Sequence, residues 1–303
     1  MSRKGAHHNR AGIKRTARGV GTREQLDALG VRPGPNSMSW RVNREAALLL
    51  GGGRALLMQI AHPLVAAGVA DHSDFKNDPL GRLRRTLDTM FSLTFGSREE
   101  AGAACERINS VHASIRGRLS RPCSGFPAGT TYDARDPQLL FWVYATLMDT
   151  AMVVYRRYVR ELSADECEQY YQESKARASL FGIPDSLVPK DAECFRAYMH
   201  EMIAHGPVVV SATARKLARS ILNPTVPAVY AWAFQMLNFV TVGLLPPELR
   251  AGFGLRWSPV RQLLLDASGA AIRAMLPLLP DLLRAVPAGR KAERAWQDRS
   301  RHS

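Results

Sequence analysis

One long apolar run constrains the fold of this chain more than any other feature. Leu139–Tyr155 is apolar except at Asp149, and Asp136 with Pro137 before it predicts an N-cap followed by the first helical residue. We therefore expect a helix from Asp136 to about Arg160. The run falls short of the roughly 20 clean residues that a bilayer core requires. It predicts a buried helix of a globular fold, in which Asp149 needs a partner such as an Arg or a helix N-terminus.

The rest of the chain is also helical in pattern. Ser97 with Glu100, and Ser163 with Glu166, have capping-box spacing, and no segment shows sustained period-2 alternation. The sequence predicts an all-α fold, a single large multi-helix domain over residues 23–300 that follows a disordered basic tail at 1–22. We expect helices at 22–29, 40–50, 54–69 with a bend near Pro63, 79–95 after an Asp78 N-cap, 97 to beyond His112, 136–160, 163–181 ending at Gly182, 190–204, 206–222, 226–242, 258–275 and 287–300.

Two glycine-rich or loop-like stretches interrupt this pattern. Gly51-Gly52-Gly53 has no Gly-Lys-Ser/Thr after it and no strand before it, so a phosphate loop is not supported. Close helix packing or a helix-to-helix turn is the interpretation that remains. Residues 117–132 are rich in Gly, Pro and Ser and predict a long loop.

Positive charge is concentrated at the two ends. The chain has 41 Lys and Arg against 27 Asp and Glu, a net charge of +14. Residues 1–22 hold six cations and no acid, and residues 284–303 hold six cations against Glu293 and Asp298. Such ends suit an anionic partner, and we expect peripheral membrane contact rather than nucleic acid. The alternative is solvated tails without a specific partner.

Several common chemistries are not supported by the sequence. It has no Cys-x-x-Cys pair, no His-Glu-x-x-His, no repeated Glu-x-x-His and no Gly-x-Ser-x-Gly. His200 and His205 are five apart and so lie on different faces of a helix. No apolar run precedes residue 30, which favours reduced thiols in a cytoplasm over a secreted protein. The cysteines are Cys105, Cys123, Cys167 and Cys194.

Ordered motifs between residues 54 and 150, and one near 243, resemble a known family. They are Arg54-Ala-Leu-Leu-Met-Gln-Ile-Ala-His62-Pro63, His72-Ser-Asp-Phe75, Asp78-Pro-Leu-Gly-Arg-Leu-Arg-Arg-Thr-Leu87, Val111-His-Ala-Ser-Ile-Arg-Gly117, Tyr132-Asp-Ala-Arg-Asp-Pro-Gln-Leu-Leu-Phe-Trp-Val-Tyr-Ala-Thr146 and Gly243-Leu-Leu-Pro-Pro-Glu-Leu-Arg250. Over residues 38–295 the chain resembles the catalytic domain shared by rubber oxygenase and the mpaB-type oxygenases. The resemblance implies a globin-like core that holds a b-type haem and uses O2 to cleave an alkene.

The resemblance also assigns roles to particular residues. His112 matches the His that ligates the haem iron, and Arg82-Leu-Arg-Arg85-Thr86 matches an Arg-x-x-Lys-Thr segment on the distal side. Arg85 stands where the rubber-cleaving branch has a Lys that can cap the iron. Because Arg stays protonated and does not coordinate iron, we expect neither a capped resting state nor rubber as the substrate.

The same residues can be judged without the resemblance. Arg82, Arg85 and Thr86 share one helix face, which could present two cations and a hydroxyl to O2 or a propionate, or could be a basic solvated face. His112 has Ile108, Val111 and Ile115 around it. It is either an iron ligand or a hydrogen-bonded core residue.

Other candidate residues have a functional and a structural interpretation. His62, beside Pro63, and His72, in a connecting loop, are pocket residues or structural ones. Arg54 in an apolar helix needs either a buried anion as partner or a position at the protein surface. A haem propionate is one candidate for the anion. Trp142, Tyr144 and Tyr155 are expected in the core, and His7, His8 and His302 lie in the tails.

The sequence therefore supports two functional hypotheses. The first is a haem-dependent oxygenase that acts with O2 on an apolar, isoprenoid-like small molecule, with His112 as the metal ligand and Arg54, His62, His72 and Arg82 near the cofactor. The second is a non-enzymatic all-α protein that binds a lipid or another hydrophobic ligand and whose basic ends contact membrane or nucleic acid.

Overall fold

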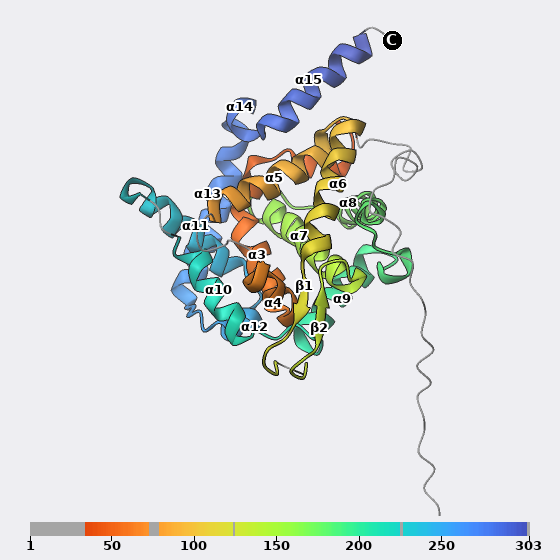
Figure 1. Cartoon of the computed structure of the whole chain (residues 1–303). Helices are drawn as coiled ribbons and strands as arrows, with labels where there is room; N and C mark the ends of the chain where they lie inside the picture. Colours follow the sequence, from red (N-terminus) through yellow and green to blue (C-terminus); the bar gives the residue numbers. More distant parts are fainter. Residues whose placement is uncertain (1–33, 73–78, 124, 225–226, 302–303) are drawn as a thin grey trace, which may run out of the picture.

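The computed structural model describes residues 34–72, 79–123, 125–224 and 227–301. The expected tail at 1–22, the helix at 22–29 and the Asp78 cap lie outside these residues. The described chain is a single all-α domain with one two-stranded hairpin, which confirms the expected fold class (Figure 1).

The elements follow one another with short connections. The α-helices are α2 (Met38–Asn43), α3 (Gly52–Ala61), α4 (Pro63–His72), α5 (Pro79–Phe95), α6 (Arg98–Ser114), α7 (Pro137–Tyr158), α8 (Ala164–Ala176), α9 (Ala192–Ala204), α10 (Ala212–Leu222), α11 (Ala231–Leu244), α12 (Pro247–Phe253), α13 (Pro259–Met275), α14 (Asp281–Arg284) and α15 (Pro287–Arg301). The 3-10 segments are η1 (Ala46–Gly51), η2 (Arg177–Phe181), η3 (Asp185–Leu187), η4 (Ala228–Tyr230) and η5 (Leu276–Leu278), and the strands are β1 (Arg116–Arg118) and β2 (Thr131–Asp133).

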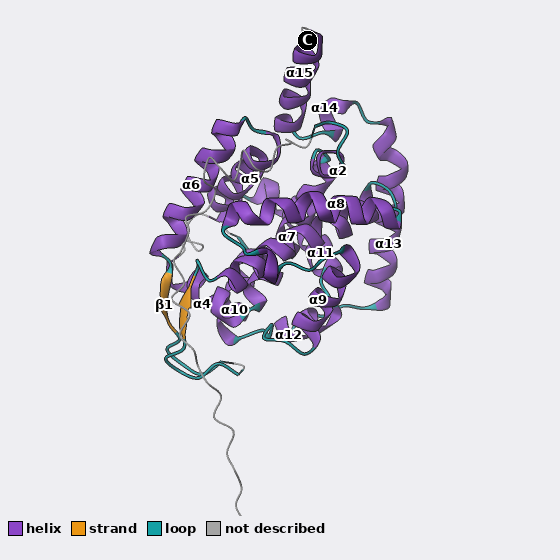
Figure 2. Ribbon diagram, turned by 90° about the vertical axis from the view of Figure 1, so that its right-hand side faces the viewer, coloured by secondary structure: helices purple, strands orange, loops and turns teal. Residues whose placement is uncertain are grey.

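Helix α7 is the central helix of the domain (Figure 2). The Asp136 side chain accepts a hydrogen bond from the Gln138 amide at 2.8 Å, and Pro137 is the first helical residue, as expected. Trp142, Tyr144 and Tyr155 are buried, which confirms their place in the core. By length and composition α7 could cross a membrane, but 67% of its apolar window is buried inside the domain.

The Gly51–Gly53 stretch is a site of close helix packing. A Cβ on Gly51 would approach the Thr150 and Val154 side chains of α7 at 2.5 and 2.8 Å. A Cβ on Gly53 would overlap the Thr241 hydroxyl of α11. The missing side chains therefore let the end of η1 approach α7 and the start of α3 approach α11, which confirms the packing interpretation over the phosphate loop.

The bend expected near Pro63 is present. The helical segments Ala46–Ala61 and Pro63–His72 meet at 106°. His62, between them, has extended backbone, and the ring of Pro63 prevents the helix from continuing straight.

The helix expected at 40–50 is wrong, because the chain turns at Arg44 and Glu45. The Glu45 carboxylate is buried and accepts hydrogen bonds from Arg284 Nε at 3.1 Å, and the Val286 amide donates to the Arg44 carbonyl at 2.8 Å. These contacts with a distant segment separate α2 from η1.

Residues 117–132 are not wholly a loop. β1 and β2 pair antiparallel, with Arg116 opposite Asp133 and Arg118 opposite Thr131. Strands of three residues are too short to show a period-2 pattern in the sequence, so the expectation of no strands is wrong here.

Smaller differences concern helix ends. Both capping boxes are confirmed, and Gly182 is left-handed with φ 73° at the end of η2, as expected. α10 begins at Ala212 rather than 206, because the Ser211 hydroxyl caps it by accepting from the Ala214 amide. α12 and α14 were not expected.

We predict that Gly53→Ala lowers the free energy of unfolding by about 2 kcal/mol, because the added methyl overlaps Thr241 and forces α3 away from α11. Urea unfolding would measure this. Thr241→Ala removes the overlapping hydroxyl, so the double variant should recover part of the loss. An additive double variant would contradict the packing role of Gly53.

Candidate functional site

Three of the candidate histidines surround the β1–β2 hairpin, which lies at the ends of α4 and α6 (Figure 2). The His62 ring lies 5.8 Å from the ring of Phe126 in the hairpin loop. His72 Nε2 is 3.1 Å from the Arg116 carbonyl oxygen of β1. His112 in α6 lies near Asp133 of β2. The hairpin, which sequence analysis missed, is thus the common element of this site.

His112 is the histidine best suited to ligate a metal ion. Burial lowers its pKa, with Asp133 opposing part of the shift, so the neutral imidazole is the stable form at neutral pH. Within the described residues neither ring nitrogen makes a hydrogen bond, whereas His62 and His72 each use one. The setting is less apolar than expected, because Val111 is exposed and Ile108 is half-buried.

Asp133 is anionic beside His112. Arg135 donates to it from Nε at 3.1 Å and from Nη2 at 2.9 Å, and this pairing lowers the pKa of Asp133. A carboxylate in this place can orient an imidazole by accepting the proton of its second nitrogen.

His62 and His72 have structural partners. His62 is buried at the α3–α4 bend, where its Nδ1 accepts a hydrogen bond from the Leu64 amide at 3.2 Å. Burial lowers its pKa from 6.5 to about 4, and Asp136 opposes this only in part. His72 is exposed, with its ring edge-on to Tyr132 at 6.1 Å.

The α5 candidates lie in the first half of that helix. Arg85 and Thr86 are exposed, and residue 82 lies in α5 but its side chain is outside the described residues. From Thr86 the same helix face continues through Met90 to Thr94, since residues four apart are neighbours on a helix.

Arg54 is held by a buried polar network. Its guanidinium is 4% exposed and donates from Nη2 to Asp149 at 2.7 Å, from Nη1 to the Thr150 hydroxyl at 2.6 Å and from Nε to the Leu244 carbonyl at 2.8 Å. An Arg partner for Asp149 is confirmed. Asp149 is partly exposed and supplies the anion that Arg54 needs, so a propionate role for Arg54 stays a prediction.

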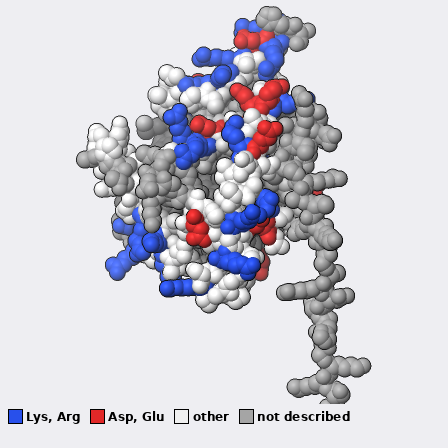
Figure 3. Space-filling model, in the orientation of Figure 1, with Lys and Arg blue, Asp and Glu red and all other residues white. Residues whose placement is uncertain are grey.

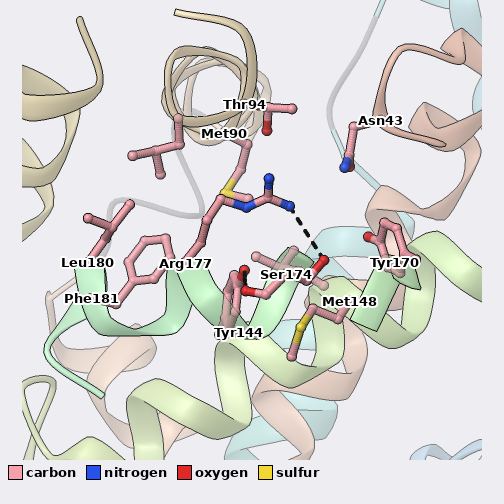
Figure 4. Close-up of a pocket in the computed structure, with 12 residues that line it drawn as sticks. Asn43, Met90, Thr94, Tyr144, Met148, Tyr170, Ser174, Arg177, Leu180 and Phe181 are labelled. Carbon is pink, nitrogen blue, oxygen red and sulfur yellow. Dashed lines mark hydrogen bonds between the residues drawn. The ribbon is translucent and has the colours of Figure 1, made fainter. Parts of the chain in front are cut away.

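A pocket between α5, α7 and α8 contains a second candidate cation, Arg177 (Figure 4). Its guanidinium donates to the hydroxyls of Ser39 at 3.2 Å and Ser174 at 3.4 Å. No carboxylate of the described residues pairs with it. The cavity volume is about 40 Å³, and the other lining residues are Asn43, Met90, Leu93, Thr94, Tyr144, Leu147, Met148, Tyr170, Leu180 and Phe181.

Tyrosines of this pocket are buried and neutral. Tyr144 donates its hydroxyl proton to the Ser174 carbonyl at 2.7 Å, and burial raises its pKa. Burial also raises the pKa of Tyr170 to about 12, and Arg177 opposes both shifts. The pocket therefore combines apolar walls, phenol hydroxyls and one cation.

Sequence analysis did not select Arg177, which has Glu173 four residues before it, at the spacing of neighbours on a helix. Glu173 instead accepts hydrogen bonds from the backbone amides of Met38 at 3.1 Å and Ser39 at 2.6 Å. This contact with α2 is tertiary, so no local signal could have shown that Arg177 turns to the pocket.

A second pocket of about 200 Å³ opens above the Arg54–Asp149 pair. It is lined also by Met58, Met199, His200, Ile203, Ala204, Pro246 and Glu248. No group of three or more His, Cys, Asp or Glu in the described parts of the chain could hold a metal ion.

Comparison with known proteins agrees with the resemblance seen in the motifs. The model of the family described as "ER-bound oxygenase mpaB/B'/Rubber oxygenase, catalytic domain" matches residues 40–274. Two similar relatives are Uncharacterized protein Mb2261 of Mycobacterium bovis and Uncharacterized protein Rv2237 of Mycobacterium tuberculosis. Each is 25% identical over 216 residues, which cover 68% of this chain and 80% of the relative. No solved structure matches the chain.

We predict that Asp149→Asn lowers the free energy of unfolding by about 3 kcal/mol, because it leaves the buried Arg54 cation without an anion. Urea unfolding at pH 7 would show the loss. Asp266→Asn, which breaks the exposed pair with Arg157, is the matched control and should unfold at the wild-type urea concentration. Equal losses in both variants would contradict the special role of the buried pair.

We predict that His62 makes stability fall in acid. Its pKa is about 4 in the fold, so below pH 6.5 the unfolded chain takes up a proton that the folded chain does not. The folded state loses about 3 kcal/mol from this group as the pH falls from 6.5 to 4.

The test compares urea unfolding of wild type and His62→Gln at pH 7 and pH 5. Between pH 7 and pH 5 the free energy of unfolding should fall more in wild type than in His62→Gln. The exposed His200→Gln serves as control. A constant difference between wild type and His62→Gln would show that His62 is not held neutral.

Proposed function

This chain belongs to the mpaB/rubber oxygenase catalytic domain family, and from that premise we propose that it is a haem-dependent oxygenase. Its substrate in this proposal is an apolar, isoprenoid-like small molecule, and O2 is the co-substrate. The observation that carries the proposal is the half-buried His112, whose lowered pKa leaves a neutral imidazole with both ring nitrogens available within the described residues.

The residues present fit a b-type haem by their donor set. A haem brings its own four nitrogen ligands, so the protein would need to contribute only one good side-chain ligand. His112 meets this requirement at the end of α6. Neither of the two pockets described above is lined by His112, so a haem held by His112 would lie outside both of them. When bound, the haem supplies the binding and activation of O2.

Asp133 is proposed to orient His112. Its carboxylate is kept anionic by Arg135, so it can accept the proton on the imidazole nitrogen that does not bind iron. That arrangement fixes the tautomer and increases the electron-donating strength of the ligand. Asp133 is held in place by its position in β2, opposite Arg116.

Arg82, Arg85 and Thr86 are proposed to act from α5. A guanidinium donates hydrogen bonds and has no acceptor lone pair, so Arg85 can favour negative charge that develops on a reacting oxygen but cannot cap iron. The Thr86 hydroxyl can donate a hydrogen bond on the same helix face. Both residues are exposed, so small molecules can reach this face from solvent.

The Arg177 pocket supports an apolar substrate with a polar end. Met90, Met148, Leu93 and Phe181 give it apolar walls, and Arg177 gives it one cation. At about 40 Å³ it holds a small group rather than a whole substrate. We propose that it receives the polar end, while the apolar remainder follows the α5 face toward Thr86.

The compartment is also a proposal. No disulfide joins the cysteines of the described residues, which supports a reducing, cytoplasmic setting.

We predict that His112→Ala abolishes tight haem binding and leaves the helical content unchanged. Titration with haemin, followed by the Soret band, measures binding, and circular dichroism measures helicity. Asp133→Asn should weaken binding about 10- to 100-fold, as expected for a group that orients a ligand.

His205→Ala, at an exposed site, is the matched control and should bind haemin like wild type. A His112→Ala spectrum identical to that of wild type would overturn the assignment and make His62 or His72 the candidate ligand. A wild-type protein that stays colourless with haemin would instead favour the lipid-binding alternative.

A further inference from the structure

The N-terminal end of α11 exposes large apolar side chains. Val229 is 67% exposed, Tyr230 57%, Trp232 69% and Met236 57%. We call these four residues the α11 tip. Figure 1 shows this end of α11 projecting from the domain, and Figure 3 shows the projection as a pale, uncharged surface. Exposed apolar groups gathered in one place mark an interaction site.

Trp232 and Met236 of the tip lie in α11, and Val229 and Tyr230 lie in the 3-10 segment η4 directly before it. At its other end α11 buries Val240, Thr241 and Leu244 in the domain. In its middle the Asn238 side chain donates to the Leu222 carbonyl, which fastens α11 to the end of α10. The tip is therefore presented at a fixed place beside α10.

The neighbouring helix α10 is strongly amphipathic and basic. Ala214, Leu217 and Ala218 are buried, while Arg215, Lys216 and Arg219 are exposed. From residue 206 to 247 the sequence has these three cations and no acid. In Figure 3 a group of Lys and Arg side chains lies over α10, directly below the pale projection. We call this basic surface the α10 face.

We propose that the α11 tip and the α10 face together dock on the surface of a bilayer that contains anionic lipids. Trp and Tyr favour the boundary between headgroups and acyl chains, and Lys and Arg beside them attract anionic headgroups. Apolar residues flanked by cations, with no acid nearby, are the composition that such a surface requires.

Charge also argues against a second copy of this chain as the occupant. In a two-fold dimer the same patch lies on both sides of the interface. A dimer through the α11 tip would bring Arg215, Lys216 and Arg219 of one copy near the same cations of the other, with no acid in this segment to offset them. A lipid surface supplies the negative charge that this patch lacks.

The test uses the full chain and sedimentation with vesicles of phosphatidylcholine, with or without phosphatidylglycerol. Wild type should bind the anionic vesicles and bind phosphatidylcholine weakly. Arg215→Gln/Lys216→Gln/Arg219→Gln should lose binding by up to about 100-fold, since each cation near an anionic surface contributes roughly a factor of five. Trp232→Ser/Met236→Ser should lose at least about tenfold, because it removes apolar side chains from the boundary.

Matched control variants remove exposed side chains of the same kinds elsewhere on the domain. Leu278→Ser/Leu282→Ser removes two leucines that are 83% and 67% exposed, away from the tip. Arg84→Gln/Lys190→Gln/Arg196→Gln removes three exposed cations on other elements. Both controls should bind within twofold of wild type. If either control loses as much binding as its partner variant, the contact is not at this surface and the proposal fails.

Trp232 provides a second readout. Its fluorescence should shift to the blue on anionic vesicles and be quenched by brominated lipid, and Trp232→Phe should bind but lose this response. A variant that lacks residues 1–22 distinguishes the contribution of the basic tail to vesicle binding from that of the α10 face. If that deletion abolishes binding while the tip and charge variants bind like wild type, the proposal is wrong. It is also wrong if the tip variant converts a dimer to a monomer without changing vesicle binding.

Discussion

The Arg54 guanidinium fastens three helices together in the interior, and the rest of the domain is arranged around it. One side chain from α3 reaches Asp149 and Thr150 of α7 and the last carbonyl of α11, at Leu244. Gly53 of α3, and Gly51 at the end of η1 just before it, have no side chain, which permits close approach to α11 and α7. Because a buried cation without an anion is costly, the position of Asp149 within the central helix restricts where α3 can lie.

Much of the fold could be predicted because its signals are local. The Asp136 cap, both capping boxes, the bend at Pro63 and the left-handed Gly182 each depend on residues a few positions apart. The errors occurred where distant segments decide the structure. Glu45 turns the chain because it meets Arg284, and β1 needs β2 as its partner.

The candidate site shows the same division. His62, His72 and His112 could be selected from the sequence, since each occurs in a recognisable motif, but the hairpin that each of them lies beside has no pattern of its own. Arg177 could not be predicted, because its helical neighbour Glu173 is taken by the amides of α2. The resemblance to a known family therefore identified the ligand candidate, whereas the pocket cation depends on a contact made 134 residues away in the chain.

Helix α11 connects the interior of the domain to the surface proposed for membrane docking. Its final carbonyl accepts from Arg54, and its first residues carry the exposed Trp232. A helix of 14 residues is about 21 Å long, so one rigid element joins the buried network to the tip. Docking through the tip would hold the whole domain at one orientation to a bilayer, because α3 and α7 are fastened to the same helix. An apolar substrate partitions into bilayers. A fixed orientation of the domain would therefore keep the α5 face at a constant distance from the bilayer that contains the substrate.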